Sequence, residues 1–188
     1  MRVISGTARG TKLNSIESLS TRPTLDRVKE SVFNIIQNKI YDSTILDLFS
    51  GSGAIAIEFL SRGSKKAYLC EKNPAAVKMI YSNIKKTKMQ DKSVVIPKDY
   101  KKALEILKQQ DIQFDFVYID PPYQADISVD SIERILSLNL LKEKGNIIIE
   151  TDDEKRELLE LKKINIEVTD IRKYGRVSLI FLAKSVTK

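Results

Sequence analysis

Histidine and tryptophan are absent from this 188-residue sequence, and cysteine occurs once, at Cys70. Without histidine, the chain cannot carry a Ser-His-Asp or Cys-His catalytic group or a zinc site that uses histidine. One cysteine cannot form an intrachain disulfide and falls well short of a zinc ligand set, so we predict no metal site. Cys70 is expected to be a small, buried strand residue.

Long apolar runs are missing as well. No stretch approaches the roughly 18 apolar residues that a membrane helix requires. The start of the chain also lacks the charged and apolar regions of a signal peptide. We therefore expect a soluble, cytoplasmic protein without a membrane partner.

The composition favours one basic, globular protein. Lys and Arg number 32 against 25 Asp and Glu, an excess that favours a polyanionic partner, with an ordinary solvated surface as the alternative. The length allows one buried α/β core and a small appendage. We predict a monomer in which residues 1–43 form the appendage and residues 44–188 form the main domain.

From Thr44 onward, short apolar runs alternate with helical patterns, which predicts a doubly wound, mostly parallel sheet with right-handed crossovers. Ile164–Lys173 and Val177–Lys184 break this alternation and predict a hairpin that makes the last strand antiparallel to its neighbours. The alternating segments, in chain order, are TILDLF, AIAIEFLSR, KAYLCE, PAAVKMIYSNIKK, SVVIP, YKKALEILKQ, FDFVYID, SVDSIERILSL and GNIIIE.

The first 43 residues have a different character. Met1–Leu13 is expected to form a small β-hairpin that turns near Gly6–Gly10, and Thr24–Lys39 is expected to form a helix with Thr24 as its N-cap. The first sixteen residues contain three basic side chains and no acidic one, so the hairpin is the candidate RNA-binding element. The three candidates are Arg2, Arg9 and Lys12.

A glycine-rich segment, Asp47–Gly53 (DLFSGSG), follows a buried strand and opens a helix, where a ligand can approach the backbone closely. The spacing also satisfies the dinucleotide fingerprint, and a tight turn without a ligand is a third interpretation. The carboxylate of Asp47 would repel a pyrophosphate, but it suits the ammonium and sulfonium charges of S-adenosylmethionine.

Three further positions fit an adenosine-containing cofactor. Glu71 ends the next strand, at the usual spacing for a carboxylate that binds ribose hydroxyls. Asp99 lies two residues beyond the third strand, where it can accept from an adenine amine or cap the helix that follows. Asn73 and Tyr100 are expected to border the adenine ring.

A rigid turn, Asp120-Pro121-Pro122-Tyr123, follows the strand FVYI at the carboxyl end of the sheet. Two consecutive prolines remove two backbone donors, which leaves a turn that presents acceptors. The Asp120 carboxylate and the Pro121 carbonyl can hold the two N–H groups of a base amine, and Tyr123 can stack on the base. The alternative is a structural proline-rich turn.

The sequence resembles the RsmD family of 16S ribosomal RNA guanine-N2 methyltransferases. The resemblance covers nearly the whole chain. The glycine loop and DPPY are shared by many base-amine methyltransferases, and the resemblance is narrowed to this family by the N-terminal stretches VISGTARGTKL and RPTLDRVKESVFN. It implies a class I S-adenosylmethionine-dependent methyltransferase domain at 44–188, with 16S ribosomal RNA or the small-subunit particle as partner. It implies that Thr24 and Arg27 contact the methionine end of the cofactor and that Asp120–Tyr123 surround the guanine. The remaining implied cofactor residues are Asp47, Ser50, Gly51, Gly53, Glu71 and Asp99.

Three alternatives stay open at this stage. An RNA or DNA adenine-N6 methyltransferase would hold its target amine with the same two acceptors. An NAD(P)-dependent oxidoreductase would use the glycine fingerprint literally. A non-catalytic RNA-binding module of methyltransferase ancestry is the third alternative, although an intact DPPY segment is poor support for it.

Overall fold

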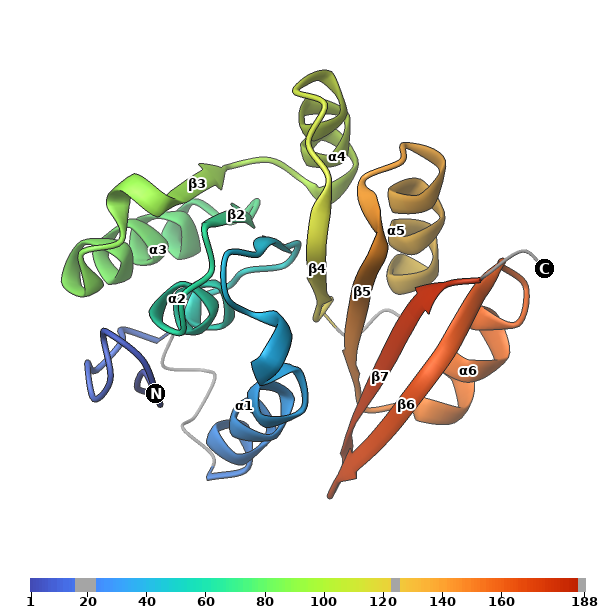
Figure 1. Cartoon of the computed structure of the whole chain (residues 1–188), viewed down its shortest axis with the longest axis horizontal. Helices are drawn as coiled ribbons and strands as arrows, with labels where there is room; N and C mark the ends of the chain where they lie inside the picture. The colour runs from blue at the N-terminus through green and yellow to red at the C-terminus, as the bar shows by residue number, and fades with distance from the viewer. Residues whose placement is uncertain (16–22, 123–125, 186–188) are drawn as a thin grey trace.

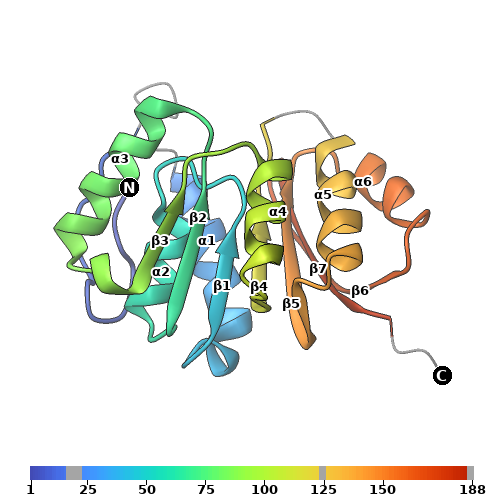
Figure 2. The ribbon, with the colours of Figure 1, turned by 90° about the horizontal axis from the view of Figure 1, so that it is seen from above.

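The computed structural model describes residues 1–15, 23–122 and 126–185 of the chain, with side chains of residues 23–26 and 126 left out. One seven-stranded sheet runs through the protein, with helices on both faces (Figures 1 and 2). The helices are α1 (Pro23–Ile36), α2 (Ala54–Ser61), α3 (Pro74–Thr87), α4 (Tyr100–Gln109), α5 (Asp126–Ser137) and α6 (Glu154–Leu161), with two short 3-10 helices, η1 (Gln37–Lys39) and η2 (Gln90–Lys92). The strands are β1 (Thr44–Asp47), β2 (Lys66–Cys70), β3 (Ser93–Ile96), β4 (Phe114–Ile119), β5 (Leu141–Thr151), β6 (Ile166–Tyr174) and β7 (Val177–Lys184).

The strand order is β3-β2-β1-β4-β5-β7-β6. The first five strands of this order pair in parallel, and β7 is antiparallel to both β5 and β6, as the sequence predicted. Apolar side chains of α1, α2 and α3 form one core cluster, and those of α4, α5 and α6 form the other on the opposite face. No helix in the described part of the chain is long and apolar enough to span a membrane.

Two helices, α1 and α6, differ from the sequence-based prediction. The first helix begins at Pro23, a residue favoured at the first helical position, so Thr24 lies inside α1 and is not its N-cap. Its α-helical part ends at Ile36, and the last three predicted residues form η1. Helix α6 was not predicted, because Leu161 is its only fully buried apolar residue and the helical periodicity is correspondingly weak.

The predicted N-terminal hairpin is present in a reduced form. A single antiparallel bridge joins Arg2 and Lys12, and it is flanked by backbone hydrogen bonds from the Val3 amide to the Thr11 carbonyl and from the Leu13 amide to the Met1 carbonyl. Gly6 has a φ of +81°, and a Cβ added there would lie 1.8 Å from the carbonyl oxygen of Ser61. Only glycine therefore allows the hairpin to lie this close to α2.

A buried carboxylate, Glu58 of α2, joins the N-terminal hairpin and α1 to the rest of the protein. Its oxygens accept from the backbone amides of Ile4 (2.8 Å) and Ser5 (3.0 Å). The same carboxylate contacts the Lys29 ammonium at 3.3 Å and the Arg62 guanidinium at 2.9 Å. Residues on both sides of position 43 also contribute to one core cluster, and the division into 1–43 and 44–188 stays a prediction.

Replacing Glu58 with Ala should lower the free energy of unfolding by about 3–5 kcal/mol, since the change removes one partner of a buried ion pair. Two backbone amides and Arg62 would also lose their acceptor. Urea unfolding followed by circular dichroism measures the loss. The matched control is Glu105→Ala, which removes an exposed i,i+3 ion pair on α4 and should leave the unfolding midpoint nearly unchanged. Equal effects of the two substitutions would contradict the role of Glu58.

Candidate active site

Four carboxylates gather where β2, β1, β4 and β5 end. Side chains that alternate along a strand share a face, and Ile45, Leu69, Tyr118 and Ile148 all contribute to the core cluster under α1, α2 and α3. The residues two positions beyond each of them are Asp47, Glu71, Asp120 and Glu150. The carboxyl edge of the sheet therefore presents a row of acidic side chains, which we call the carboxylate row.

The glycine loop between β1 and α2 is held in one conformation by two hydrogen bonds of Ser50. The Ser50 amide donates to the Cys70 carbonyl at 2.9 Å, and the Ser50 hydroxyl donates to the Asp47 carbonyl at 2.7 Å. Gly51 and Gly53 have φ values of +52° and +77°, a backbone conformation that favours glycine. A Cβ added to Gly51 would point into open space, so the loop leaves room for a ligand on that side.

Glu71 holds this loop from the neighbouring strand. Its carboxylate accepts from the amide of Gly51 at 3.0 Å and from the amide of Asn73 at 2.8 Å. The Asn73 side chain caps α3 by accepting from the amides of Ala75 and Ala76. A carboxylate at the predicted ribose position is therefore held in place by two backbone donors.

Asp47 is the most enclosed member of the carboxylate row, with 2% of its surface exposed. Its Oδ2 accepts from the amide of Ala56, in the first turn of α2, at 3.4 Å. Burial, together with the charge of Glu71, raises the pKa of Asp47 from its ordinary 3.8 to about 7. A cation bound beside this group would relieve both causes.

At the start of α4, Asp99 and Tyr100 make local contacts. Asp99 caps the helix by accepting from the amides of Lys101 and Lys102 at 3.1 and 3.2 Å, as the structural interpretation predicted. The Tyr100 hydroxyl donates to Asp130 at 2.7 Å, and its ring lies 5.6 Å from that of Phe49. The adenine contacts of Asn73, Asp99 and Tyr100 stay predictions.

The Asp-Pro-Pro turn leaves β4 beside the glycine loop, because β1 pairs with β4 directly. Asp120 keeps an exposed edge, yet the surrounding protein desolvates its carboxylate and the charges of Glu150, Asp47 and Asp152 add to this effect. These causes raise the pKa of Asp120 well above its usual range.

Three predicted site residues are less well placed. Tyr123 and the side chain of Thr24 lie outside the described residues, so their roles stay predictions. Arg27 is exposed on α1, and among the described residues no hydrogen bond or ion pair joins it to the glycine loop.

Sequence reasoning missed a pair of residues in this site, Tyr118 and Glu150. Tyr118 is 1% exposed, and its hydroxyl donates to Glu150 Oε2 at 2.5 Å. Glu150 occupies the position on β5 that follows the one paired with Ile119 of β4, next to Asp120. Alternation along FDFVYID and GNIIIE placed both residues on one face, and this signal could have found them.

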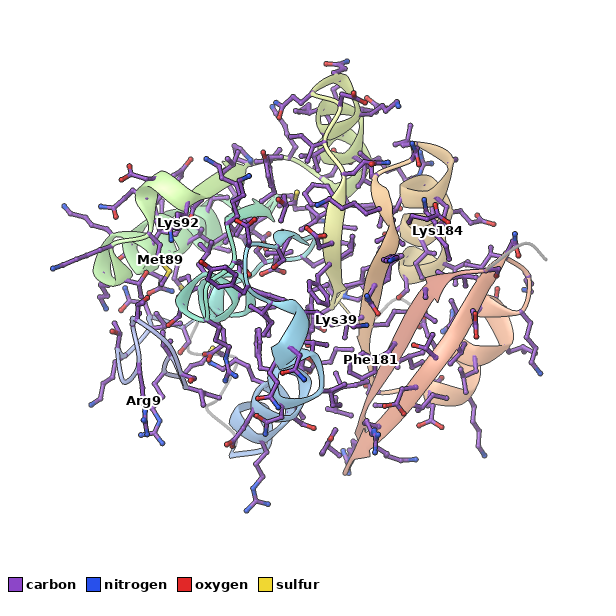
Figure 3. All side chains as sticks on the ribbon, in the orientation of Figure 1. Arg9, Lys39, Met89, Lys92, Phe181 and Lys184 are labelled. Carbon is purple, nitrogen blue, oxygen red and sulfur yellow. The ribbon has the colours of Figure 1, made fainter. Side chains whose placement is uncertain are left out.

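The first residue of the basic hairpin reaches the glycine loop, where the Ser52 hydroxyl lies 4.0 Å from the Met1 sulfur. Arg2, Arg9 and Lys12 are exposed, and the Arg9 side chain extends away from the body of the protein (Figure 3). A surface pocket of about 270 Å³ lies between the hairpin and Glu30 of α1, and it shares no lining residue with the glycine loop or the Asp-Pro-Pro turn. Within the described residues, no three metal-ligating side chains lie close enough together to hold an ion.

Comparisons with known proteins identify the family of the chain. A family model described as "Conserved hypothetical protein 95" matches residues 1–183. The Ribosomal RNA small subunit methyltransferase D of Haemophilus influenzae is 34% identical over 82% of this chain and 80% of its own. The chain belongs to the RsmD family.

Two further comparisons extend the similarity. The putative rRNA methyltransferase YlbH of Bacillus subtilis is 36% identical over 82% of this chain and 84% of its own. The solved structure of the putative methyltransferase yhhF from Escherichia coli superimposes on 100% of this RsmD-family chain and 99% of its own, with 25% identity and a TM-score of 0.81. The fold is the class I fold of S-adenosylmethionine-dependent methyltransferases, as the sequence predicted.

Replacing Asp47 with Asn should stabilise the folded protein, and more so at pH 8 than at pH 5. The folded protein holds the Asp47 proton up to about pH 7, whereas the unfolded chain releases it near 3.8, so wild-type stability falls as pH rises through this range. The gain should be about 4 kcal/mol at pH 8 and less than half of that at pH 5. Urea titrations of both proteins at both pH values measure it, and a gain independent of pH would contradict the raised pKa.

Proposed function

We propose that this protein transfers a methyl group from S-adenosylmethionine to the exocyclic N2 amine of a guanine in 16S ribosomal RNA. The observation that carries the proposal is the direct pairing of β1 with β4, which brings the glycine loop beside Asp120 and Pro121. Relatives named as small-subunit ribosomal RNA methyltransferases support the substrate class.

The glycine loop and its neighbours fit the cofactor. Asp47 is a buried carboxylate that matches the cofactor's positive charges, and Gly51 leaves open space beside the loop. Glu71 would accept from the ribose hydroxyls, and Asp99 and Tyr100 would border the adenine. When bound, the cofactor supplies an electrophilic methyl group on its sulfonium.

The Asp-Pro-Pro turn would prepare the target amine. The Asp120 carboxylate and the Pro121 carbonyl accept from its two N–H groups, which favours the pyramidal nitrogen that attacks. The amine held in this way would receive the methyl group that the cofactor supplies and would then lose a proton. This step requires no general base with a raised pKa, because the nitrogen loses its extra proton readily once it carries the methyl group.

The sheet order weighs against the oxidoreductase alternative. Dinucleotide-binding folds have the order 3-2-1-4-5-6, whereas this sheet places an antiparallel β7 between β5 and β6. The adenine-N6 alternative would use the same Asp-Pro-Pro turn. Identifying the modified nucleoside distinguishes it from guanine-N2 methylation.

The N-terminal hairpin is the proposed contact to the RNA backbone. Arg2 and Lys12 are neighbours across the bridge, and Arg9 lies near the turn. All three side chains are exposed, so they can reach phosphates without first breaking buried contacts. Glu58 fixes the hairpin relative to the site, which allows both to engage one RNA.

Asp120→Ala should abolish the formation of N2-methylguanosine while leaving cofactor affinity within a few fold. The test incubates enzyme, labelled S-adenosylmethionine and small-subunit RNA or particles, and identifies the modified nucleoside by mass. Asp120→Asn keeps an acceptor oxygen without the charge and should give an intermediate rate. The control is Asp91→Ala, an exposed aspartate before β3, at the opposite edge of the sheet.

Two outcomes would count against this mechanism. An Asp120→Ala enzyme that keeps more than a tenth of wild-type kcat would remove Asp120 from the reaction, since that threshold is only about 1.4 kcal/mol. Detection of N6-methyladenosine instead of N2-methylguanosine would favour the adenine-N6 alternative.

Replacing Arg9 and Lys12 together with Ala should raise the KM for RNA and leave cofactor affinity unchanged. Each lost phosphate contact should reduce the slope of log affinity against log salt by roughly 0.7–0.9. The control replaces Lys108 and Lys144, which are exposed on α4 and β5, and should alter neither value. A wild-type salt slope in the hairpin variant would show that RNA binds elsewhere.

A further inference from the structure

The mechanism above leaves one member of the carboxylate row without a role. Glu150 is neither one of the proposed cofactor contacts nor one of the two acceptors for the target amine. Its position is nevertheless well defined, because Ile149 pairs with Ile119 on the neighbouring parallel strand. Glu150 therefore stands beside Asp120, at about the 4.8 Å separation of adjacent strands. Adjacent polar atoms of a single base can contact two groups spaced in this way.

A buried hydroxyl orients the Glu150 carboxylate. Tyr118, on the same face of β4, donates to Glu150 Oε2 at 2.5 Å. Among the described residues, no donor contacts Glu150 Oε1. One oxygen is thus held by the protein, and the other is available to a ligand donor beside Asp120. An oriented carboxylate without a cationic partner favours a neutral donor such as N–H.

Guanine and adenine present opposite groups at this position. When Asp120 and Pro121 hold the exocyclic amine, the carbon that carries the amine has N1 as a ring neighbour in either base, and in guanine N3 is its other ring neighbour. Guanine carries a hydrogen on N1 and can donate to a carboxylate, whereas N1 of adenine is an acceptor whose lone pair would face negative charge. A carboxylate next to the amine site therefore selects a base with N1–H.

We propose that Glu150 is a specificity-determining residue that accepts a hydrogen bond from N1–H of the target guanine. This inference rests on the proposed function, because it assumes that Asp120 and Pro121 hold the N2 amine. Glu150 then makes the third contact on one base edge, and it separates guanine-N2 from adenine-N6 methylation. Tyr118 acts through Glu150 as a positioning residue.

The test uses 2-aminopurine in place of the target guanine in a synthetic RNA fragment carrying the mapped site. This base keeps the 2-amino group, but its N1 is an acceptor. Wild-type enzyme should methylate the 2-aminopurine RNA with a kcat/KM at least about tenfold below that of the guanine RNA, as expected for one lost charge-assisted hydrogen bond.

Glu150→Gln should reverse this preference in part. The glutamine oxygen can accept from Tyr118, which leaves its NH₂ group to donate to an acceptor N1. We expect kcat/KM for guanine RNA to fall by about 10- to 100-fold. We also expect the ratio of guanine to 2-aminopurine turnover to fall at least about tenfold. The control is Glu143→Gln, an exposed glutamate at the other end of β5, which should leave both values unchanged.

The outcomes separate the two proposals. No methylation of guanine RNA by wild-type enzyme would overturn the proposed function itself. Normal guanine methylation with equal use of 2-aminopurine by wild-type enzyme would overturn the role of Glu150, whether or not any variant folds. A slower Glu150→Gln enzyme with an unchanged base ratio would reduce Glu150 to a structural residue and also overturn the inference.

Discussion

Parallel pairing of β1 with β2 on one side and β4 on the other is the constraint on which the site depends. These pairings end at one edge of the sheet, so groups that follow different strands become neighbours. The same arrangement crowds Asp47, Asp120 and Glu150, and desolvation by the surrounding protein opposes the ionisation of these carboxylates. The site is therefore an unfavourable charge arrangement that the surrounding fold maintains, and binding a cation would relieve it.

A second constraint connects the N-terminal segment to that edge. Glu58 contacts both the hairpin and α1, and it does so from within the helix that begins at the glycine loop. A buried ion pair of this kind contributes little net stability compared with apolar packing, but it strongly disfavours arrangements that leave the charge unpaired. The hairpin and the carboxyl edge of the sheet consequently keep one relative position, which the proposed methylation of a large RNA would require.

The members of the carboxylate row have different proposed partners along the sheet edge. Glu71 and Asp47 lie at the cofactor end, on the two strands that flank the glycine loop. In the proposed reaction, the cofactor's methyl group and the base amine would meet at Asp120, and Glu150 lies one strand further on. Carboxylates at the ends of neighbouring parallel strands can thus bind the cofactor, hold the reacting amine and recognise the base.

The order of strands and helices from Thr44, the C-terminal hairpin and the glycine loop followed from local patterns, because periodicity and turn residues act over short distances. Those patterns could not find α6, whose exposed residues dominate its sequence, or the helix start at Pro23. Nor could they reveal that Tyr118 orients Glu150 or that Glu58 holds the hairpin. Such contacts join segments far apart in the chain, and only the packing of the folded protein decides which buried polar groups meet.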